Sequence, residues 1–254
     1  MKVYFLGTGS GTEPIAGVYH QSIAVEINNN IYFFDCGEGC SRRAHLNGVD
    51  ILKTKAIFIT HTHMDHVGGL GNLLWNMRKL HSNIEFADGV CSKDVYIPNI
   101  VTYNAFMDIL KNTEGGFDTF FDINGFEYTS GVIYENEDIK VSASPSRHMG
   151  DNPIRSYSLK LESEGKKIII SGDLYSLDEL DAQLADGCDM LICETGHFTI
   201  QEVCEYARQK NVKKLCFSHN CRNIIKHRHQ SENSVINIFG DSAFIAYDGL
   251  IINF

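Results

Sequence analysis

Four side chains that can bind a metal ion lie within six positions of the sequence. The segment HTHMDH contains His61, His63, Asp65 and His66, and it directly follows the apolar run KAIFIT. Residues two apart in an extended segment point in the same direction, so His61 and His63 can reach one ion together. A helix predicted to begin near Met64 turns Asp65 and His66 in another direction, toward a second ion. Imidazole and carboxylate ligands suit zinc, with manganese or iron as less selective alternatives.

Two metal ions need more than four ligands, and three further candidates each follow a predicted strand. KVSASPSRH ends at His148, KKIIISGD ends at Asp173 and KKLCFSH ends at His219. The ends of strands are where a sheet scaffold presents its functional side chains. These three residues are therefore grouped with the HTHMDH segment as candidate metal ligands.

The elements that must position these residues are mostly strands. Alternating or continuous apolar runs predict them at residues 2–6, 22–27, 31–35, 55–60, 94–98, 138–145, 156–163, 166–173, 188–195 and 212–219. Helices are predicted at 37–48, at 99–112, from Ser176, from Thr199, and along the apolar positions Leu70, Leu73, Leu74, Met77 and Leu80. The final segment, 243–254, carries Asp-Gly between two apolar runs, which indicates a hairpin. Residues 82–137 otherwise show little regularity.

Composition limits the classes of protein that this chain can belong to. A chain of 254 residues with 43% hydrophobic content suits one domain with a sizeable core. The formal net charge of -10 argues against tight, non-specific binding of nucleic acid. The chain shows no signal-peptide pattern and no apolar run of the roughly 20 residues that span a bilayer, so a cytoplasmic location and no membrane association are expected. The eight cysteines lack short paired spacing and are expected to be thiols.

Several segments together resemble the ribonuclease Z branch of the metallo-β-lactamase superfamily. They are FLGTGSG, FFDCGEGCSRR, ITHTHMDHVGGL, SGD and ICET. The resemblance covers nearly the whole chain and implies an α+β fold, a four-layer αββα sandwich with a two-metal site, formed by a single domain over residues 1–254. It implies two divalent ions per chain, most simply zinc. The ligands would be His61, His63 and His148 for the first ion, Asp65, His66 and His219 for the second, and Asp173 as a bridge.

The resemblance also suggests roles for acidic and histidine residues beside the ligands. His197, in ETGHFTIQE, resembles a histidine next to the leaving group, where it could donate a proton; the alternative is a structural histidine. Glu194 could orient a ligand histidine as a hydrogen-bond acceptor. Asp65 could orient or deprotonate the nucleophile while it holds metal. Asp35 is expected to be a structural acid beneath the metal-bearing loops.

Three departures from the branch concern its substrate, transfer RNA. Ribonuclease Z enzymes carry an arm that grips transfer RNA between the positions matching His148 and Asp173, which are about 25 residues apart here and filled by two predicted strands. The segment between Glu194 and His197 is short, and TEPIAGVYHQ lacks Lys and Arg. The chain is therefore predicted to be a dinuclear metal-dependent hydrolase, a phosphodiesterase whose substrate is a small phosphodiester or a short single-stranded RNA end rather than a full transfer RNA.

Other interpretations of the same sequence stay open. The metal site could serve a hydrolase of a carbonyl ester, thioester or lactone, because fold alone does not fix the substrate. A redox diiron protein, or a non-catalytic module that binds nucleic acid or regulates, would retain the same fold. A homodimer could supply the basic surface that the chain itself lacks.

Overall fold

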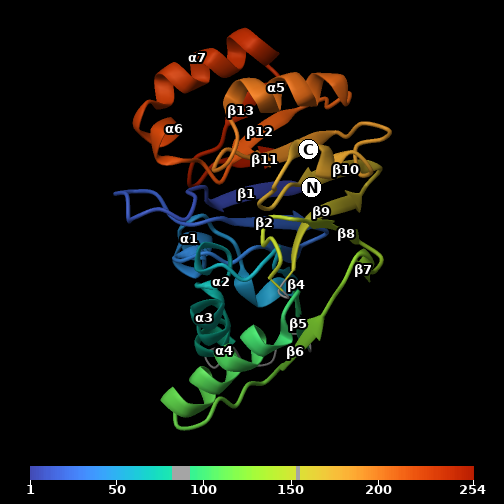
Figure 1. Ribbon diagram of the computed structural model, residues 1–254. Coiled ribbons are helices and arrows are strands. Elements are labelled where there is room, and N and C mark those ends of the chain that lie inside the picture. Colours follow the sequence, from blue (N-terminus) through green and yellow to red (C-terminus); the bar gives the residue numbers. More distant parts are fainter. Residues whose placement is uncertain (82–91, 153–154) are drawn as a thin grey trace. The chain divides into compact units, whose positions relative to one another are not determined.

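The computed structural model describes residues 1–81, 92–152 and 155–254. The chain divides into two compact units (Figure 1). Unit 1 comprises Met1–Gly7, Tyr19–Tyr128 and Asp248–Phe254, and unit 2 comprises Thr8–Val18 and Thr129–Tyr247. Within the described residues each unit contains one seven-stranded sheet. The prediction of a single domain over residues 1–254 stays a prediction.

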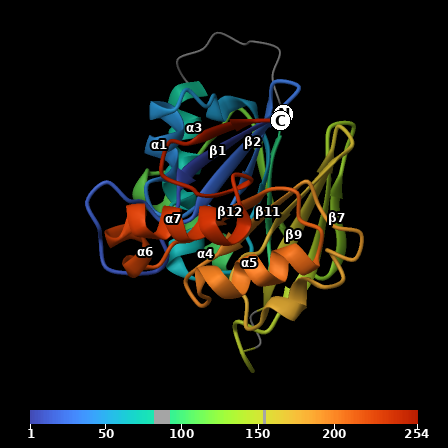
Figure 2. The same cartoon turned by 90° about the horizontal axis from the view of Figure 1, so that it is seen from above.

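The sheet of unit 1 has the strand order β14-β1-β2-β3-β4-β5-β6. Its strands from β3 to β6 run parallel, and its pairs from β14 to β3 are antiparallel. Both chain ends lie side by side (Figure 2), because β1 pairs with β14. The strands are β1 (Lys2–Gly7), β2 (Ser22–Ile27), β3 (Asn30–Phe34), β4 (Thr54–Phe58), β5 (Ser92–Ile97), β6 (Asp122–Glu127) and β14 (Ile251–Asn253).

Helices pack an apolar core against the sheet of unit 1 (Figure 1). The helical segments are α1 (Cys40–Leu46), η1 (Ile51–Lys53), α2 (Met64–Val67), α3 (Leu70–His81) and α4 (Ile100–Thr113). The predicted apolar face of α3 is confirmed for its four buried members, Leu70, Leu73, Leu74 and Met77. It is wrong for Leu80, which is 41% exposed, because the last turn of α3 extends beyond the core.

The sheet of unit 2 has the strand order β13-β12-β11-β10-β9-β8-β7. Strands β10 to β13 run parallel and the pairs from β7 to β10 are antiparallel. The strands are β7 (Gly131–Glu135), β8 (Lys140–Ser146), β9 (Ser156–Ser163), β10 (Lys166–Ile170), β11 (Met190–Glu194), β12 (Leu215–Ser218) and β13 (Ala243–Ile245).

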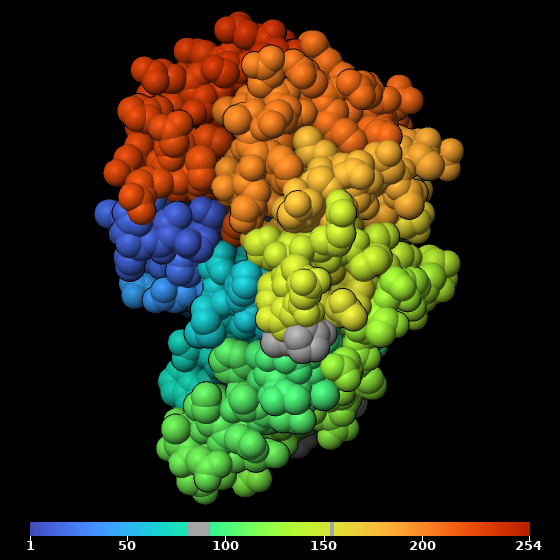
Figure 3. All heavy atoms as spheres, in the orientation of Figure 1, coloured from blue at the N-terminus to red at the C-terminus, as the bar shows by residue number. Residues whose placement is uncertain are grey.

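Helices α5 and α7 lie side by side and pack against this second sheet (Figures 1 and 2). In the space-filling view their segments, coloured orange to red, form an outer surface of unit 2 (Figure 3). Helix α5 begins with a capping box, in which Thr199 and Glu202 each bind the other's backbone N–H, as favoured at helix starts. The helical segments are η2 (Leu177–Leu180), α5 (Ile200–Gln209), α6 (Arg222–Lys226) and α7 (Arg228–Phe239).

The structure corrects several sequence predictions. The predicted hairpin over 243–254 is wrong, because β13 pairs with β12 in one sheet and β14 pairs with β1 in the other. The helix predicted from Ser176 is only the short 3-10 turn η2. Strands β6 and β7 and helices α6 and α7 were not predicted, and residues 82–91 of the irregular stretch lie outside the described residues.

The cysteines follow the expectation within the described residues. The seven cysteines that the structure describes are all free thiols, and six of them are buried; Cys91 lies outside the described residues. Burial raises the pKa of the Cys36 thiol well above its ordinary value. Among the described helices, none has both the length and the apolar character needed to cross a membrane.

Candidate metal centre

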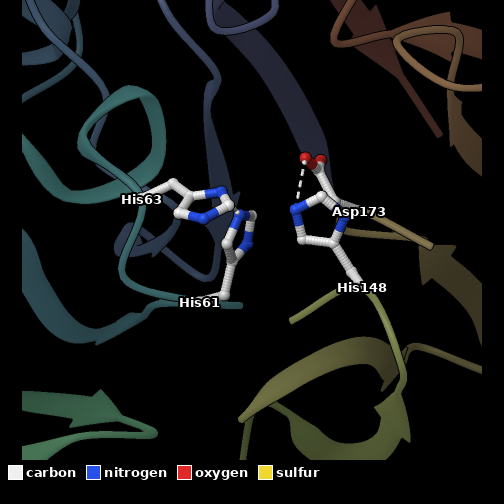
Figure 4. A group of neighbouring side chains, drawn as sticks. All are labelled: His61, His63, His148 and Asp173. Carbon is white, nitrogen blue, oxygen red and sulfur yellow. Dashed lines mark hydrogen bonds and ion pairs between the residues drawn. The ribbon is translucent and has the colours of Figure 1, made fainter. Parts of the chain in front are cut away.

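In unit 1 the HTHMDH segment begins just past the end of β4 and runs into α2. His61 Nε2 and His63 Nδ1 lie 3.0 Å apart, and their ring centroids are 4.6 Å apart. Figure 4 shows both rings projecting from this one loop. The predicted common direction of the two histidines is confirmed, although both lie in the loop rather than in the strand.

The other two members of the segment lie on α2, for which His63 is the residue that precedes the first turn. His66 is fully buried, and its Nε2 lies 3.6 Å from Asp65 Oδ2. The opposite ring nitrogen, Nδ1, lies 2.8 Å from Asp35 Oδ2. A histidine whose Nδ1–H is held by a carboxylate presents Nε2 as its ligand atom, which is the arrangement that metal-binding histidines favour.

Asp35 follows β3 and is fully buried. Besides His66, its carboxylate accepts hydrogen bonds from the Thr60 backbone N–H at 2.8 Å and from Thr60 Oγ1 at 3.0 Å. These contacts tie the end of β3 to the loop that carries the histidines. The expectation that Asp35 is a structural acid beneath this loop is confirmed, and sequence analysis missed its partner Thr60.

Close backbone contacts hold the same loop in place. The Cys36 N–H donates to the His66 carbonyl at 2.6 Å, and the Gly69 N–H donates to the Cys36 carbonyl at 2.7 Å. A Cβ at Gly37 would lie 2.4 Å from the Asp65 carbonyl oxygen, which no side chain tolerates. The glycines of GEG and VGGL therefore allow two backbones to meet directly beneath the candidate ligands.

In unit 2 the three remaining candidate ligands come from the ends of β8, β10 and β12. His148 Nε2 lies 3.5 Å from Asp173 Oδ2, which is the pair joined by the dashed line in Figure 4. His219 Nδ1 lies 3.4 Å from the other oxygen, Asp173 Oδ1. The two oxygens of one carboxylate therefore face two different histidines, as expected of a carboxylate that bridges two ions.

These separations fit a divalent metal ion. Two ligand atoms on one tetrahedral zinc, each about 2.0–2.1 Å from the ion, lie roughly 3.3–3.4 Å apart. The four separations within the units are 3.0, 3.4, 3.5 and 3.6 Å. The donors are imidazole and carboxylate without thiolate, which suits zinc, manganese or iron. Within unit 1 and within unit 2, these neighbouring side chains are therefore spaced as ligands of a divalent ion.

Hydrogen bonds also fix the ligand-bearing loops of unit 2. Ser146 Oγ donates to the Asp173 carbonyl at 2.7 Å, which ties the loop before His148 to the loop after β10. His219 has the left-handed backbone conformation, with φ at 52°, and its carbonyl accepts from the Thr195 N–H at 3.3 Å. A left-handed conformation is uncommon for a residue other than glycine and often marks a functional position.

Glu194 is the last residue of β11, and ligand atoms of Glu194, Asp173 and His219 lie within 4.8 Å of one another. Glu194 Oε1 accepts from the Leu174 N–H at 2.8 Å. Its Oε2 lies 2.7 Å from His197 Nδ1 and accepts from the His197 N–H at 2.9 Å. Because both oxygens accept hydrogen bonds, Glu194 is better suited to orient a histidine than to bind metal.

The histidine that Glu194 orients is His197 rather than a predicted ligand. The distance from Glu194 Oε2 to His219 Nδ1 is 3.9 Å, which is too long for a hydrogen bond. The His197 ring stands edge-on to the His148 ring, with centroids 4.9 Å apart, and its side chain is 44% exposed. His197 is thus an accessible imidazole held beside a candidate metal ligand.

Comparisons with known proteins agree with this arrangement. The family described as anti-Pycsar protein Apyc1 matches residues 1–237. The chain belongs to this family. It is also similar to the ribonuclease Z of Methanothermobacter thermautotrophicus, with 29% identity over 86% of each chain. Among solved structures, human tRNase Z, short form (ELAC1), has a TM-score of 0.76 at 21% identity, covering 100% of this chain and 99% of the other.

A further solved structure, the Zn(2+)-bound PqqB of Methylobacterium extorquens, has a TM-score of 0.74 at 12% identity over 100% of both chains. The metallo-beta-lactamase fold protein YhfI of Bacillus subtilis has a TM-score of 0.76 at 17% identity over 99% of both chains. The predicted α+β fold of the metallo-β-lactamase type is confirmed by this neighbour. The prediction of a metal-dependent hydrolase of the ribonuclease Z-like branch is likewise confirmed.

Proposed function

We propose that this protein hydrolyses a small phosphodiester with two divalent metal ions, most simply zinc. The observation that carries the proposal is the carboxylate of Asp173, whose two oxygens face His148 and His219 at 3.5 and 3.4 Å. A bridging carboxylate of this kind serves two ions, and the two ions would divide the remaining ligands between them. In this proposal His61, His63 and His148 hold one ion, and Asp65, His66 and His219 hold the other.

Bound ions would supply Lewis acidity and a water that is deprotonated near neutral pH. Asp65 would contribute as an acceptor. Its carboxylate lies 3.6 Å from His66 Nε2, and its side chain is only 12% exposed, so its orientation is restricted. A carboxylate held in this way can accept a hydrogen bond from the attacking water and aim it at phosphorus.

His197 would protonate the departing oxygen. With Nδ1 at 2.7 Å from the Glu194 carboxylate, the ring is favoured in a form that carries a proton on Nδ1, and the negative charge stabilises the imidazolium. The imidazolium also carries a proton on Nε2, which it can donate to an alkoxide leaving group. Glu194 thus acts on the reaction through the orientation and charge of His197.

Features of the chain favour a small substrate. The described residues between His148 and Asp173 form β9 and β10, an antiparallel pair whose register runs from Lys166–Ser163 to Ile170–Leu159. We infer that the arm by which ribonuclease Z enzymes grip transfer RNA is absent here. The net charge of -10 also disfavours the many phosphate contacts that a full transfer RNA requires. A short single-stranded RNA end fits the same limits.

The family to which the chain belongs is described as anti-Pycsar protein, and we propose that this chain likewise opposes another system. A hydrolase opposes another system most directly by destroying a small molecule on which that system depends. A small phosphodiester substrate is compatible with such a role.

The test is a substrate panel on protein of measured metal content. It comprises a cyclic mononucleotide, an activated aryl phosphodiester, a dinucleotide, a transfer-RNA precursor, a thioester, a lactone and a β-lactam. We expect about two metal ions per chain and the highest kcat/KM on a small diester. Preferred hydrolysis of the thioester or lactone would overturn the reaction class, and preferred release of the 3′ trailer would overturn the substrate size. Sedimentation of the same sample tests whether a homodimer forms.

A further inference from the structure

Two exposed side chains flank the candidate ligands of unit 2. Arg147 directly precedes His148, and Tyr175 follows Asp173 by two positions. The Arg147 guanidinium lies over the Tyr175 ring, 4.8 Å from its centroid. The Arg147 side chain is 65% exposed and Tyr175 is 67% exposed. A stacked cation and aromatic ring therefore lie open to solvent on the two loops that carry His148 and Asp173.

A single carboxylate fixes both members of this pair. Glu179 Oε1 accepts from Arg147 Nε at 2.9 Å and from the Arg147 backbone N–H at 3.0 Å. Glu179 Oε2 accepts from the Tyr175 backbone N–H at 3.1 Å. Ser176 Oγ accepts from Arg147 Nη2 at 3.0 Å. The Glu179 side chain is only 8% exposed, so the carboxylate is a rigid anchor for two exposed groups.

Stability alone does not account for this arrangement. The buried Glu179 carboxylate needs its hydrogen-bond donors for stability, but the Arg147 guanidinium and the Tyr175 ring are both mostly exposed. Stacking between two exposed groups contributes little to folding. The arrangement instead holds a flat cation and a flat ring in fixed positions next to metal-ligand loops. Flat, electron-rich rings and guanidinium groups are the surfaces on which nucleobases stack, and such stacking is tolerant of base identity.

We propose that the Arg147–Tyr175 pair binds the base of a nucleotide ester whose phosphate is hydrolysed beside His148 and Asp173. This inference rests on the proposed phosphodiesterase function and names the two side chains that would hold the base of its substrate. The Glu179 carboxylate neutralises the Arg147 charge, so the pair would hold the base by stacking rather than by net charge. Glu179 acts as a positioning residue, because it touches the pair and not the ligand.

The experiment compares two diesters with the same leaving group on metal-loaded protein. One is a nucleoside 5′-(p-nitrophenyl phosphate), and the other is methyl p-nitrophenyl phosphate, which lacks a base. For Tyr175→Leu we expect KM for the nucleoside ester to rise roughly 5- to 150-fold with kcat little changed, as for loss of base stacking. For the methyl ester, KM and kcat should be the same in wild type and variant. Glu179→Gln should give a smaller rise in the same direction.

A matched control is present in the same unit. Tyr247 is 52% exposed and lies under Arg228, with the guanidinium 5.2 Å from the ring centroid, but in the sequence it is not next to a candidate ligand. Tyr247→Leu should leave KM and kcat unchanged for both esters. Equal losses on both esters for Tyr175→Leu, or equal effects of the two tyrosine substitutions, would overturn the assignment of the pair.

Binding separates this inference from the proposed function. A nucleoside 5′-monophosphate is titrated calorimetrically into wild type and Tyr175→Leu, with inorganic phosphate and a short oligonucleotide as further ligands. The assignment of the pair is supported if Tyr175→Leu lowers the affinity for the nucleotide and the oligonucleotide but not for phosphate. It is refuted if the nucleotide binds both proteins with equal affinity. Absence of turnover on every diester would refute the proposed function, while this titration would still decide whether the pair binds a base.

Discussion

Asp35→Asn is a sharp test of how unit 1 prepares a histidine for metal. Asparagine keeps the size of the side chain and tolerates the left-handed backbone of this position, where φ is 59°. It also retains one oxygen that can accept from the Thr60 N–H, which now lies 2.8 Å from Asp35 Oδ1. The substitution therefore removes the negative charge while it leaves the backbone unstrained.

The expected effect on metal binding follows from the Asp35–His66 contact of 2.8 Å. An amide group in place of Oδ2 donates a hydrogen bond, and so it favours His66 with an unprotonated Nδ1. The proton then sits on Nε2, the nitrogen that would have to bind the ion. Loss of such a partner typically lowers metal affinity 10- to 100-fold, which corresponds to about 1.4–2.7 kcal/mol.

The metal-free protein should also become less stable, by roughly 1–3 kcal/mol, because His66 and Thr60 lose a charged acceptor in a fully buried place. Urea unfolding with excess chelator measures this cost. Competition between protein and a chromogenic chelator for zinc measures the affinity separately.

Asp108→Asn is the control for both measurements, since Asp108 is an exposed residue of α4. It should change neither stability nor zinc affinity. If Asp35→Asn lowers the stability of the metal-free protein but binds zinc as tightly as wild type, Asp35 supports the loop without preparing His66. The reasoning about the His66 tautomer would then be wrong.

Three further predictions follow from named contacts. Asp173→Asn should lower the metal content by elemental analysis more than any single histidine substitution, and a full complement of metal would refute its bridging role. His197→Gln should lower kcat on a diester with an alkoxide leaving group by about 10²–10⁴, and much less on a p-nitrophenyl diester, whose leaving group needs no proton; equal losses on both would refute the proton donor. Burial and a 2.5 Å hydrogen bond to Glu26 raise the pKa of Tyr4 to about 12. The folded state thus holds this proton more tightly than the unfolded state, so the stabilisation is complete below about pH 10 and is lost toward pH 12, and Tyr4→Phe should remove that part of the alkaline decline in urea-unfolding free energy.

The parts of the candidate site that sequence could predict are local. His61 and His63 are two residues apart in an extended segment, so their shared direction depends on backbone geometry alone. The positions of Asp173 and His219 depend on where apolar runs end, which is visible in KKIIISGD and KKLCFSH. The bridging arrangement itself came from the resemblance, and the distances to Asp173 support it.

The parts that sequence could not predict depend on partners distant along the chain. Nothing near Asp248 and Gly249 shows that β13 and β14 join different sheets, because each strand is selected by its neighbour, β12 or β1. The same holds for Glu179, whose hydrogen bond to Arg147 spans 32 positions. The sequence after Ser176 predicts an ordinary helix, whereas the structure has a short 3-10 turn whose Glu179 binds the backbone of both Arg147 and Tyr175.

Backbone strain and chemistry coincide at two positions of this fold. Asp35 and His219 both follow a strand directly, both are buried, and both adopt the left-handed conformation, with φ at 59° and 52°. Each such residue costs on the order of 1–3 kcal/mol, and glycine would avoid that cost. Glycine would also remove the carboxylate that holds His66 and the imidazole that faces Asp173. The hydrogen bonds from Thr60 to Asp35 and from Thr195 to the His219 carbonyl offset the strain locally. The chain therefore tolerates a strained backbone at two positions whose side chains, a carboxylate and an imidazole, glycine could not supply.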